Sequence, residues 1–247
     1  MSGQVLESLH DIVSAEYPTY IGGGTDIMPL LKNEVRDDKD FVFLKKIPEL
    51  HVLEEKDGEL IIGATMTLTE LAESALLNSR YAAIAQAASL TASPQIRNIA
   101  TVGGNIMQDR RCIYFNQPHL WRSGLACHEH LPILVTRFLV PAAEEGERSG
   151  FYKYAMRTTI DFPIINFALR CGGNRPARLA AGAVAPHPVV MAETAAKIDS
   201  DATDDEVIAQ AEDELRKLAM PIKEACMTPA VKRSLYRHVA MLLDLRK

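Results

Sequence analysis

Apolar residues at the start of the chain follow a helical spacing that then gives way to a strand-like one. They recur at helical intervals over residues 5–13, and after the break at Pro18 the short run 19–21 predicts a strand. That strand leads into Gly22-Gly23-Gly24, and residues 27–32 then predict the start of a helix. A glycine loop is therefore expected to join a strand to a helix.

The following apolar runs predict further strands and a hairpin. Residues 41–44 are continuously apolar and predict a buried strand. Residues 51–53 and 60–64 flank a charged turn that contains Asp57-Gly58, and an Asp-Gly turn between two strand-like runs is a strong hairpin signal.

Helices and a second glycine loop are predicted next. Thr67 and Glu70 fit a capping box before residues 71–77, because each side chain can satisfy a backbone N–H group of the other residue. An alanine-rich helix is predicted from residue 81 to about residue 92. Gly103-Gly104 then follows a run of small and β-branched residues.

The last hundred residues predict grouped strands followed by helices. The predicted strands are 151–157, 164–170 and 177–184, and the predicted helices are 207–218 and 230–245. This order indicates an α+β fold and differs from a continuous βαβ series.

Composition narrows the class of protein. The chain has 247 residues, of which 47% are hydrophobic, and a net charge of −5, which excludes disorder and argues against nucleic-acid binding. No apolar run approaches the roughly 20 residues of a membrane span, and the first residues do not resemble a signal peptide. Four scattered cysteines are too few for a disulfide scaffold, so we expect a cytoplasmic protein.

Both glycine loops could approach a phosphate closely. Gly22-Gly23-Gly24 lies between a strand and a helix, where bare N–H groups can bind a pyrophosphate, and Gly103-Gly104 could form the opposite wall. Either loop alone is more typical of a tight turn, because glycine-rich turns are common. Neither fits the dinucleotide or P-loop patterns, which disfavours a nicotinamide Rossmann domain and a P-loop ATPase.

Three motifs, taken together, are specific enough to indicate a protein family. The sequence Ile21-Gly22-Gly23-Gly24-Thr25-Asp26, the segment from Ile96 to Ile106 and the segment from Tyr152 to Arg157 resemble the FAD-binding subunit or domain of the molybdenum hydroxylases, the xanthine dehydrogenase and carbon monoxide dehydrogenase family. The resemblance covers most of the chain. It implies an α+β fold: a two-subdomain FAD-binding domain of the PCMH type over 1–143, with subdomains of about 1–55 and 56–143, then a C-terminal subdomain over 150–247 with a three-stranded sheet and helices.

The resemblance also implies the cofactor site. The first loop would hold the FAD pyrophosphate, and the second would face the cofactor from the other side. Lys153 would lie near the isoalloxazine and stabilise reduced flavin, unless it is a solvated strand lysine. No catalytic residue is identified. The implied binding residues are Gly22, Gly23, Gly24, Thr25, Asp26, Thr101, Gly103, Gly104, Asn105 and Lys153.

The function implied is that of an FAD-binding electron-transfer subunit. Electrons would pass between FAD and the [2Fe–2S] clusters of a partner chain. The molybdenum cofactor and those clusters would lie on a molybdopterin-binding large subunit and a [2Fe–2S] small subunit, in a dimer of heterotrimers. Two alternatives stay open: a self-contained FAD-dependent oxidoreductase of the same fold, and a scaffold subunit without cofactor.

The region after residue 108 is most similar to the middle subunit of 4-hydroxybenzoyl-CoA reductase, through residues 109–117 with Trp121-Arg122. That branch has an insertion whose four cysteines bind a [4Fe–4S] cluster. Here only Cys112 and Cys127 fall in this region, so a cluster is disfavoured but stays open. Between Cys127 and Phe151 the chain is shorter than is usual for the family, either naturally or because a segment is absent from this sequence.

Overall fold

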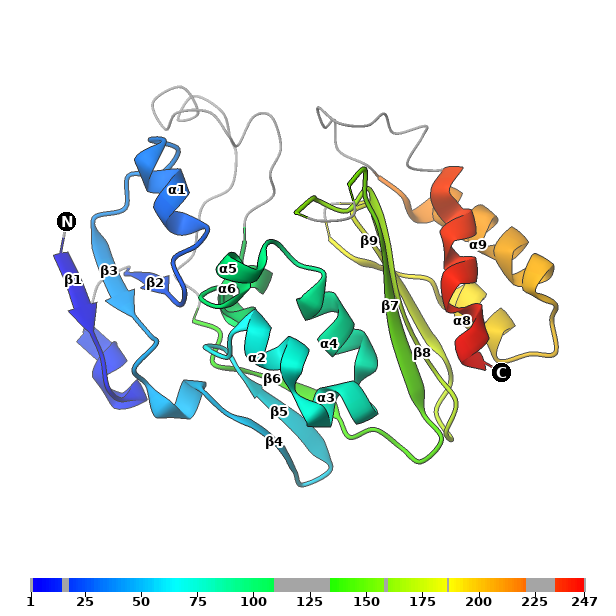
Figure 1. Ribbon diagram of the computed structural model, residues 1–247, viewed down its shortest axis with the longest axis horizontal. Coiled ribbons are helices and arrows are strands. Elements are labelled where there is room, and N and C mark those ends of the chain that lie inside the picture. Colours follow the sequence, from blue (N-terminus) through cyan, green and yellow to red (C-terminus); the bar gives the residue numbers. More distant parts are fainter. Residues whose placement is uncertain are drawn as a thin grey trace. The chain divides into compact units, whose positions relative to one another are not determined.

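Residues 2–14, 18–108, 134–157, 160–185, 187–220 and 234–246 are described by the structure, a computed structural model (Figure 1). The chain forms two compact units. The first contains Met1–Glu70 and Pro94–Ala142, and the second contains Leu71–Ser93 and Ala143–Lys247. Residues 71–93 thus belong to the same unit as the C-terminal part of the chain. The domain limits inferred from the sequence stay a prediction.

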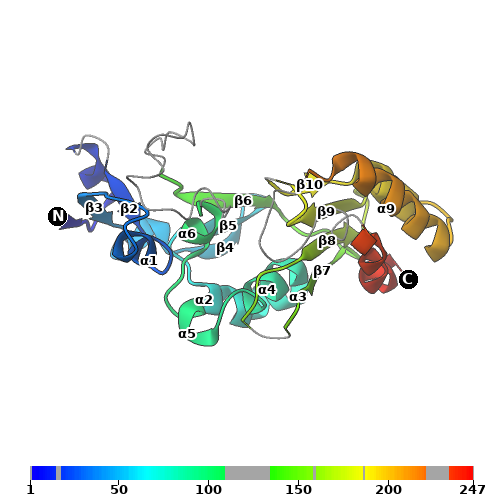
Figure 2. The same ribbon diagram turned by 90° about the horizontal axis from the view of Figure 1, so that it is seen from above.

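A three-stranded parallel sheet opens the first unit. Its order is β1 (Ser2–Val5), β3 (Asp40–Phe43) and β2 (Thr19–Ile21), and α1 (Ile27–Lys32) follows β2 (Figure 2). The helix predicted over 5–13 is partly wrong. Residues 2–5 pair with β3, and only Leu9–Ser14 is helical, as the 3-10 helix η1.

The core of this sheet explains that difference. Val42, Leu44, Ile47 and Leu50 form a buried cluster, and Leu9 and Ile12 of η1 pack against it. The apolar spacing of residues 9–12 therefore does face a core. The residues before them gain a complete row of backbone pairs with β3, a non-local interaction that helical spacing does not reveal.

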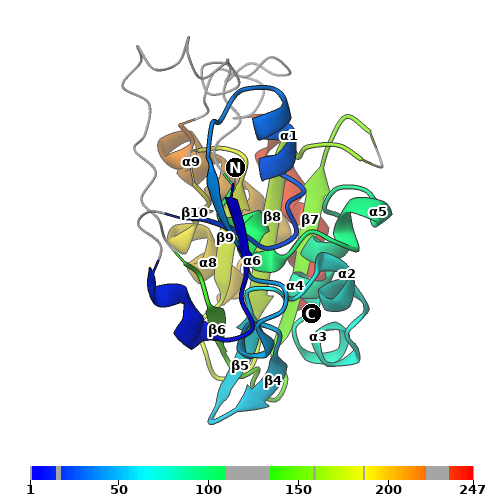
Figure 3. The same ribbon diagram turned by 90° about the vertical axis from the view of Figure 1, so that its left-hand side faces the viewer.

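An antiparallel sheet is the second sheet of the first unit. The predicted hairpin is confirmed as β4 (Leu53–Lys56) and β5 (Glu59–Gly63), with β6 (Arg137–Pro141) along the other edge of β5 (Figure 3). Asp57 and Gly58 have φ angles of 52° and 79°. Positive φ at both central residues is the requirement of a type I′ hairpin turn.

A capping box starts α2 (Leu68–Glu73). Glu70 Oε2 accepts a hydrogen bond from Thr67 N–H at 2.8 Å, and Thr67 Oγ1 accepts one from Glu70 N–H at 3.2 Å. The predicted box is confirmed, with the helix starting three residues earlier than expected. Thr67 also forms an isolated antiparallel bridge with Thr101, which ties the second glycine loop to this segment.

The second unit has an antiparallel sheet between two groups of helices (Figure 1). One group is α3 (Ala75–Arg80) and α4 (Ala82–Ser89). The sheet order is β10 (Val189–Val190), β9 (Arg178–Gly182), β8 (Ile165–Cys171) and β7 (Arg148–Tyr154). The three predicted strands are all present, and β10 adds a short fourth one.

The other helices cover the opposite face of this sheet. They are α8 (Ala192–Ile198), α9 (Asp204–Leu218) and the 3-10 helix η3 (Leu235–Arg246). Phe167 and Leu179 of the sheet and Leu215 of α9 are completely buried in the shared core. The predicted helix over 230–245 corresponds to η3 in its described part. No helix in the described ranges has the length and apolar character needed to cross a membrane.

A buried carboxylate joins α8 and α9. Glu214 is only 4% exposed, and its two oxygens accept hydrogen bonds from the N–H groups of Glu193 and Thr194 and from the Thr194 hydroxyl, at 2.7–3.0 Å. Glu214 therefore caps the start of α8 from the neighbouring helix, where it satisfies N–H groups that have no partner within α8.

Candidate functional site

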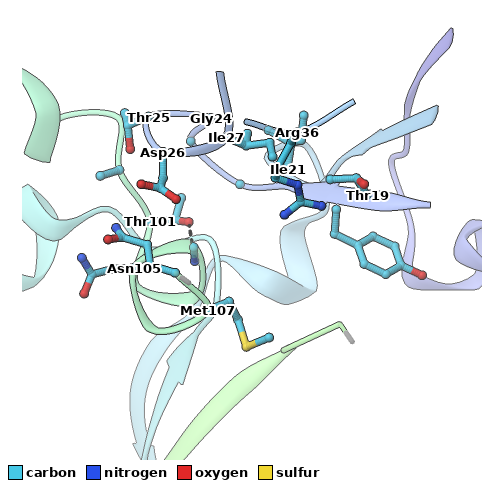
Figure 4. Close-up of a pocket in the computed structure, with 16 residues that line it drawn as sticks. Thr19, Ile21, Gly24, Thr25, Asp26, Ile27, Arg36, Thr101, Asn105 and Met107 are labelled. Carbon is cyan, nitrogen blue, oxygen red and sulfur yellow. Dashed lines mark hydrogen bonds between the residues drawn. The ribbon is translucent and has the colours of Figure 1, made fainter. Parts of the chain in front are cut away.

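The two glycine loops, about eighty residues apart in sequence, line one cavity of about 120 Å³. Residues 22–26 form one wall, and Thr101, Gly104 and Asn105 form the wall that faces it (Figure 4). Gly103 lines a smaller adjoining cavity of about 70 Å³, which Gly22, Thr101 and Gly104 also line. Nine of the ten predicted binding residues are thus brought together within the first unit.

Three of the glycines are required by contacts within the protein. A Cβ atom on Gly22 would lie 2.3 Å from Thr101 Oγ1, and one on Gly23 would lie 2.0 Å from the carbonyl oxygen of Ile99. A Cβ atom on Gly103 would lie 2.8 Å from the backbone oxygen of Ala64. The absence of side chains at Gly22 and Gly23 therefore lets the two loops pack against each other, and its absence at Gly103 lets the second loop pack against Ala64, whatever ligand they bind.

The other two glycines have different constraints. Gly24 has a φ angle of 73°, a conformation that glycine adopts without strain. At Gly104 a Cβ atom would meet, among the described residues, only Thr101 Oγ1, at 3.1 Å. An added methyl group would therefore meet little resistance from these neighbours.

Thr101 acts first as a helix cap. It is 2% exposed, and its Oγ1 accepts a hydrogen bond from the Gly104 N–H group at 3.2 Å, which starts α6 (Val102–Ile106). The hydroxyl is thus engaged within its own loop. Asn105 follows one residue later on α6 and lines the cavity, where its amide can both donate and accept hydrogen bonds.

The first loop offers backbone donors. Within the described ranges, the N–H groups of Gly22, Gly23, Gly24 and Thr25 donate to no other protein group. The Thr25 hydroxyl can donate as well, whereas the carboxylate of Asp26 can only accept. Asp26 is therefore suited to a ligand hydroxyl rather than to a phosphate oxygen.

Arg36 also lines the cavity, and sequence reasoning missed it (Figure 4). It forms a two-point ion pair with Asp38: Nε donates to Oδ2 at 2.6 Å, and Nη2 donates to Oδ1. Thr19 Oγ1 donates to the same carboxylate. Burial by itself raises the pKa of Asp38, but the hydrogen bonds from Arg36 and Thr19 outweigh it and lower the pKa below its ordinary value.

Lys153 lies on β7 in the second unit and is not among the residues lining either cavity. Its ammonium group donates to the carbonyl oxygens of Leu90 at 2.8 Å and Asp161 at 2.6 Å. Both are backbone groups of the same unit, so the lysine holds the segment after β7 in place. Its role at the flavin stays a prediction.

One of the four cysteines lies in the core, and the other three lie in regions that the structure does not describe. Cys171 is buried at the end of β8, its thiol donates to the carbonyl of Leu245 at 3.4 Å, and burial raises its pKa. It is a core residue. Cys112, Cys127 and Cys226 lie outside the described residues. Among those described, no group of three or more histidine, cysteine or acidic residues could hold a metal ion.

The family follows from comparison with known proteins. Residues 3–210 match the family described as the FAD binding domain in molybdopterin dehydrogenase. The chain belongs to this family. It is thereby an oxidoreductase flavoprotein of the molybdenum hydroxylase type.

Curated members of the family are recognisably similar in sequence. The xanthine dehydrogenase FAD-binding subunit of Escherichia coli O157:H7 is 32% identical over 197 residues, which covers 68% of each chain. The carbon monoxide dehydrogenase medium chain of Hydrogenophaga pseudoflava is 33% identical over 86 residues, or 35% of this chain and 30% of that one. The narrower resemblance to 4-hydroxybenzoyl-CoA reductase stays a prediction.

Solved structures confirm the fold class. Carbon monoxide dehydrogenase from Hydrogenophaga pseudoflava superposes with a TM-score of 0.79 at 20% identity, covering 96% of this chain and 93% of that one. Quinoline 2-oxidoreductase from Pseudomonas putida 86 gives a TM-score of 0.80 at 18% identity, covering 99% and 95%. The mixed arrangement of helices and sheets is that of these solved chains.

Proposed function

We propose that this chain binds FAD with the diphosphate in the cavity between its two glycine loops, and that it serves as the electron-transfer subunit of a molybdenum-containing hydroxylase or dehydrogenase. The observation that carries the proposal is the meeting of both loops at one cavity in a chain of this family. Gly104 adds to it, because it lines this cavity and no side chain of its own occupies space there.

The cavity suits one part of a dinucleotide. At about 120 Å³ it is smaller than the roughly 300–1,000 Å³ of a complete small-molecule site. Its walls offer backbone N–H groups on residues 22–25 that donate to no other group in the described part of the chain, together with the Thr25 hydroxyl. Such a set of donors binds phosphate oxygens. The diphosphate is therefore the part of FAD assigned to this cavity.

The remaining wall residues can orient the rest of the cofactor. Asp26 accepts a hydrogen bond from a hydroxyl of the sugar or of the ribityl chain, and Asn105 can donate to a phosphate from the opposite wall. Lys153 is assigned to the isoalloxazine side, where a cation favours the reduced anionic flavin. The bound flavin supplies a ring system that takes up an electron pair and releases it in single steps.

Relatives of this chain are named as one subunit or one chain of a larger enzyme. We therefore assign the molybdenum cofactor to a molybdopterin-binding large subunit and the electron acceptor or donor to a [2Fe–2S] small subunit, in a dimer of heterotrimers in the cytoplasm. If this chain also binds a [4Fe–4S] cluster, which two cysteines in this region disfavour, Cys112 and Cys127 would be two of its ligands.

Isolation of the intact complex from its own cells tests this assignment. We expect the chain to elute with a large and a small partner, and the complex to contain flavin, iron and molybdenum. The chain expressed alone should show the absorption bands of oxidised flavin and should not turn over a substrate of the complex. Turnover by the isolated chain would instead support a self-contained oxidoreductase, and a colourless chain that takes up no added FAD would indicate a scaffold.

A further inference from the structure

Arg36 is carried to the cavity by the turn that ends α1. Glu34 has a φ angle of 56°, and the Val35 N–H group donates to the carbonyl of Leu30 at 2.9 Å. This is the pattern of a Schellman motif, which reverses the chain and usually has glycine at the position of Glu34. Because Val35 is buried, the reversal is fixed, and the next residue returns to the wall of the cavity.

The guanidinium of Arg36 is oriented by its ion pair. Asp38 receives two hydrogen bonds from it, and Thr19 donates to the same carboxylate from β2, the strand that leads into the first glycine loop. The side chains of Arg36 and Asp38 are only 18% and 14% exposed. The arginine is therefore fixed to the glycine loop through β2 and does not sample solvent freely.

The contribution of the Arg36–Asp38 ion pair to the free energy of unfolding does not explain why the pair is there. Removing two charges from water costs much of what their attraction returns, so a nearly buried ion pair contributes little net stability. It does position a cation. Among the described residues that line the cavity, Arg36 is the only basic one. A planar, permanently charged guanidinium is the group best matched to phosphate oxygens.

We infer that Arg36 is a cofactor-binding residue that contacts the diphosphate and is positioned for this by Asp38 and Thr19. The inference rests on the proposed FAD function and extends it. It assigns the affinity for the diphosphate to a charge beside the glycine loops as well as to their backbone donors. A ligand that carries the adenosine diphosphate without the flavin, ADP itself, should then depend on Arg36 as strongly as FAD does.

The test compares two charge-removing variants of the full chain. Arg36→Gln removes the cation at the cavity. Lys32→Gln removes one from the last turn of α1, where the side chain is exposed and does not line the cavity. The dissociation constant of FAD is measured by fluorescence at low and at moderate salt, and that of ADP by its displacement of FAD. Thermal unfolding of the flavin-free chains monitors folding.

For Arg36→Gln we expect FAD and ADP to bind at least about tenfold more weakly and by a similar factor, with a smaller salt dependence. Lys32→Gln should change either constant less than about twofold. Arg36→Lys, which keeps the charge without the planar fork, should fall between Arg36→Gln and the unmodified chain.

Three results overturn the inference. These are unchanged FAD binding in Arg36→Gln, equal losses in Arg36→Gln and Lys32→Gln, and a loss for FAD without a loss for ADP. Failure of the unmodified chain to bind FAD is a separate result, because it rejects the proposed function itself.

Discussion

Replacing Gly23 with alanine should disrupt the first unit and abolish FAD binding. The new Cβ atom would lie 2.0 Å from the carbonyl oxygen of Ile99 and 2.7 Å from its carbon, so the backbone of one loop must move. Overpacking typically costs about 1–3 kcal/mol and occasionally more, and we expect the upper end here because backbone atoms are the neighbours. We expect a large fall in the midpoint of thermal unfolding, or insoluble protein, together with loss of the flavin bands.

Gly104→Ala is the matched control, because it adds the same methyl group to the facing loop. Only Thr101 Oγ1 would have to shift, by a few tenths of an ångström, and alanine is the better helix former. The folded chain should persist, with weaker FAD binding if the cofactor occupies the cavity there. A Gly23→Ala chain as stable as the unmodified one would contradict the contact between the loops.

Replacing Glu214 with alanine should destabilise the second unit by about 3 kcal/mol. The substitution removes three hydrogen bonds and leaves the N–H groups of Glu193 and Thr194 at the start of α8 without an acceptor. Each unsatisfied buried donor costs roughly 1–3 kcal/mol. Chemical unfolding of the full chain, followed by circular dichroism, measures the loss.

Asp213→Ala provides the control for that measurement. It removes the neighbouring carboxylate on the same helix, but Asp213 is exposed, so the unfolding midpoint should hardly change. If Glu214→Ala and Asp213→Ala unfold at the same denaturant concentration, Glu214 does not hold the two helices together.

Local signals in the sequence predicted the elements they control. The Asp57-Gly58 turn and the Thr67–Glu70 capping box were predicted correctly, because each depends on residues a few positions apart. The strand β1 over residues 2–5 is not predicted from the sequence, because its backbone pairs with β3, more than thirty residues further along the chain. No local pattern contains that information.

The candidate site could be predicted in part, because some of its residues lie in contiguous motifs. The glycine loops could be identified because their motifs are contiguous, and the structure brings them to one cavity. Arg36 lies in a charged stretch without periodicity and reaches the cavity through a turn that has glutamate where glycine is usual. Its place at the cavity can therefore be found only from the three-dimensional structure. Glu214 was missed likewise, because its partners lie on another helix.

The location of FAD in an experimentally determined structure of the full chain tests the central claim most directly. We expect the diphosphate in the cavity between the loops, with its oxygens within hydrogen-bond distance of the N–H groups of residues 22–25 and of the Arg36 guanidinium. FAD bound with its diphosphate elsewhere, with this cavity filled only by water, would contradict it.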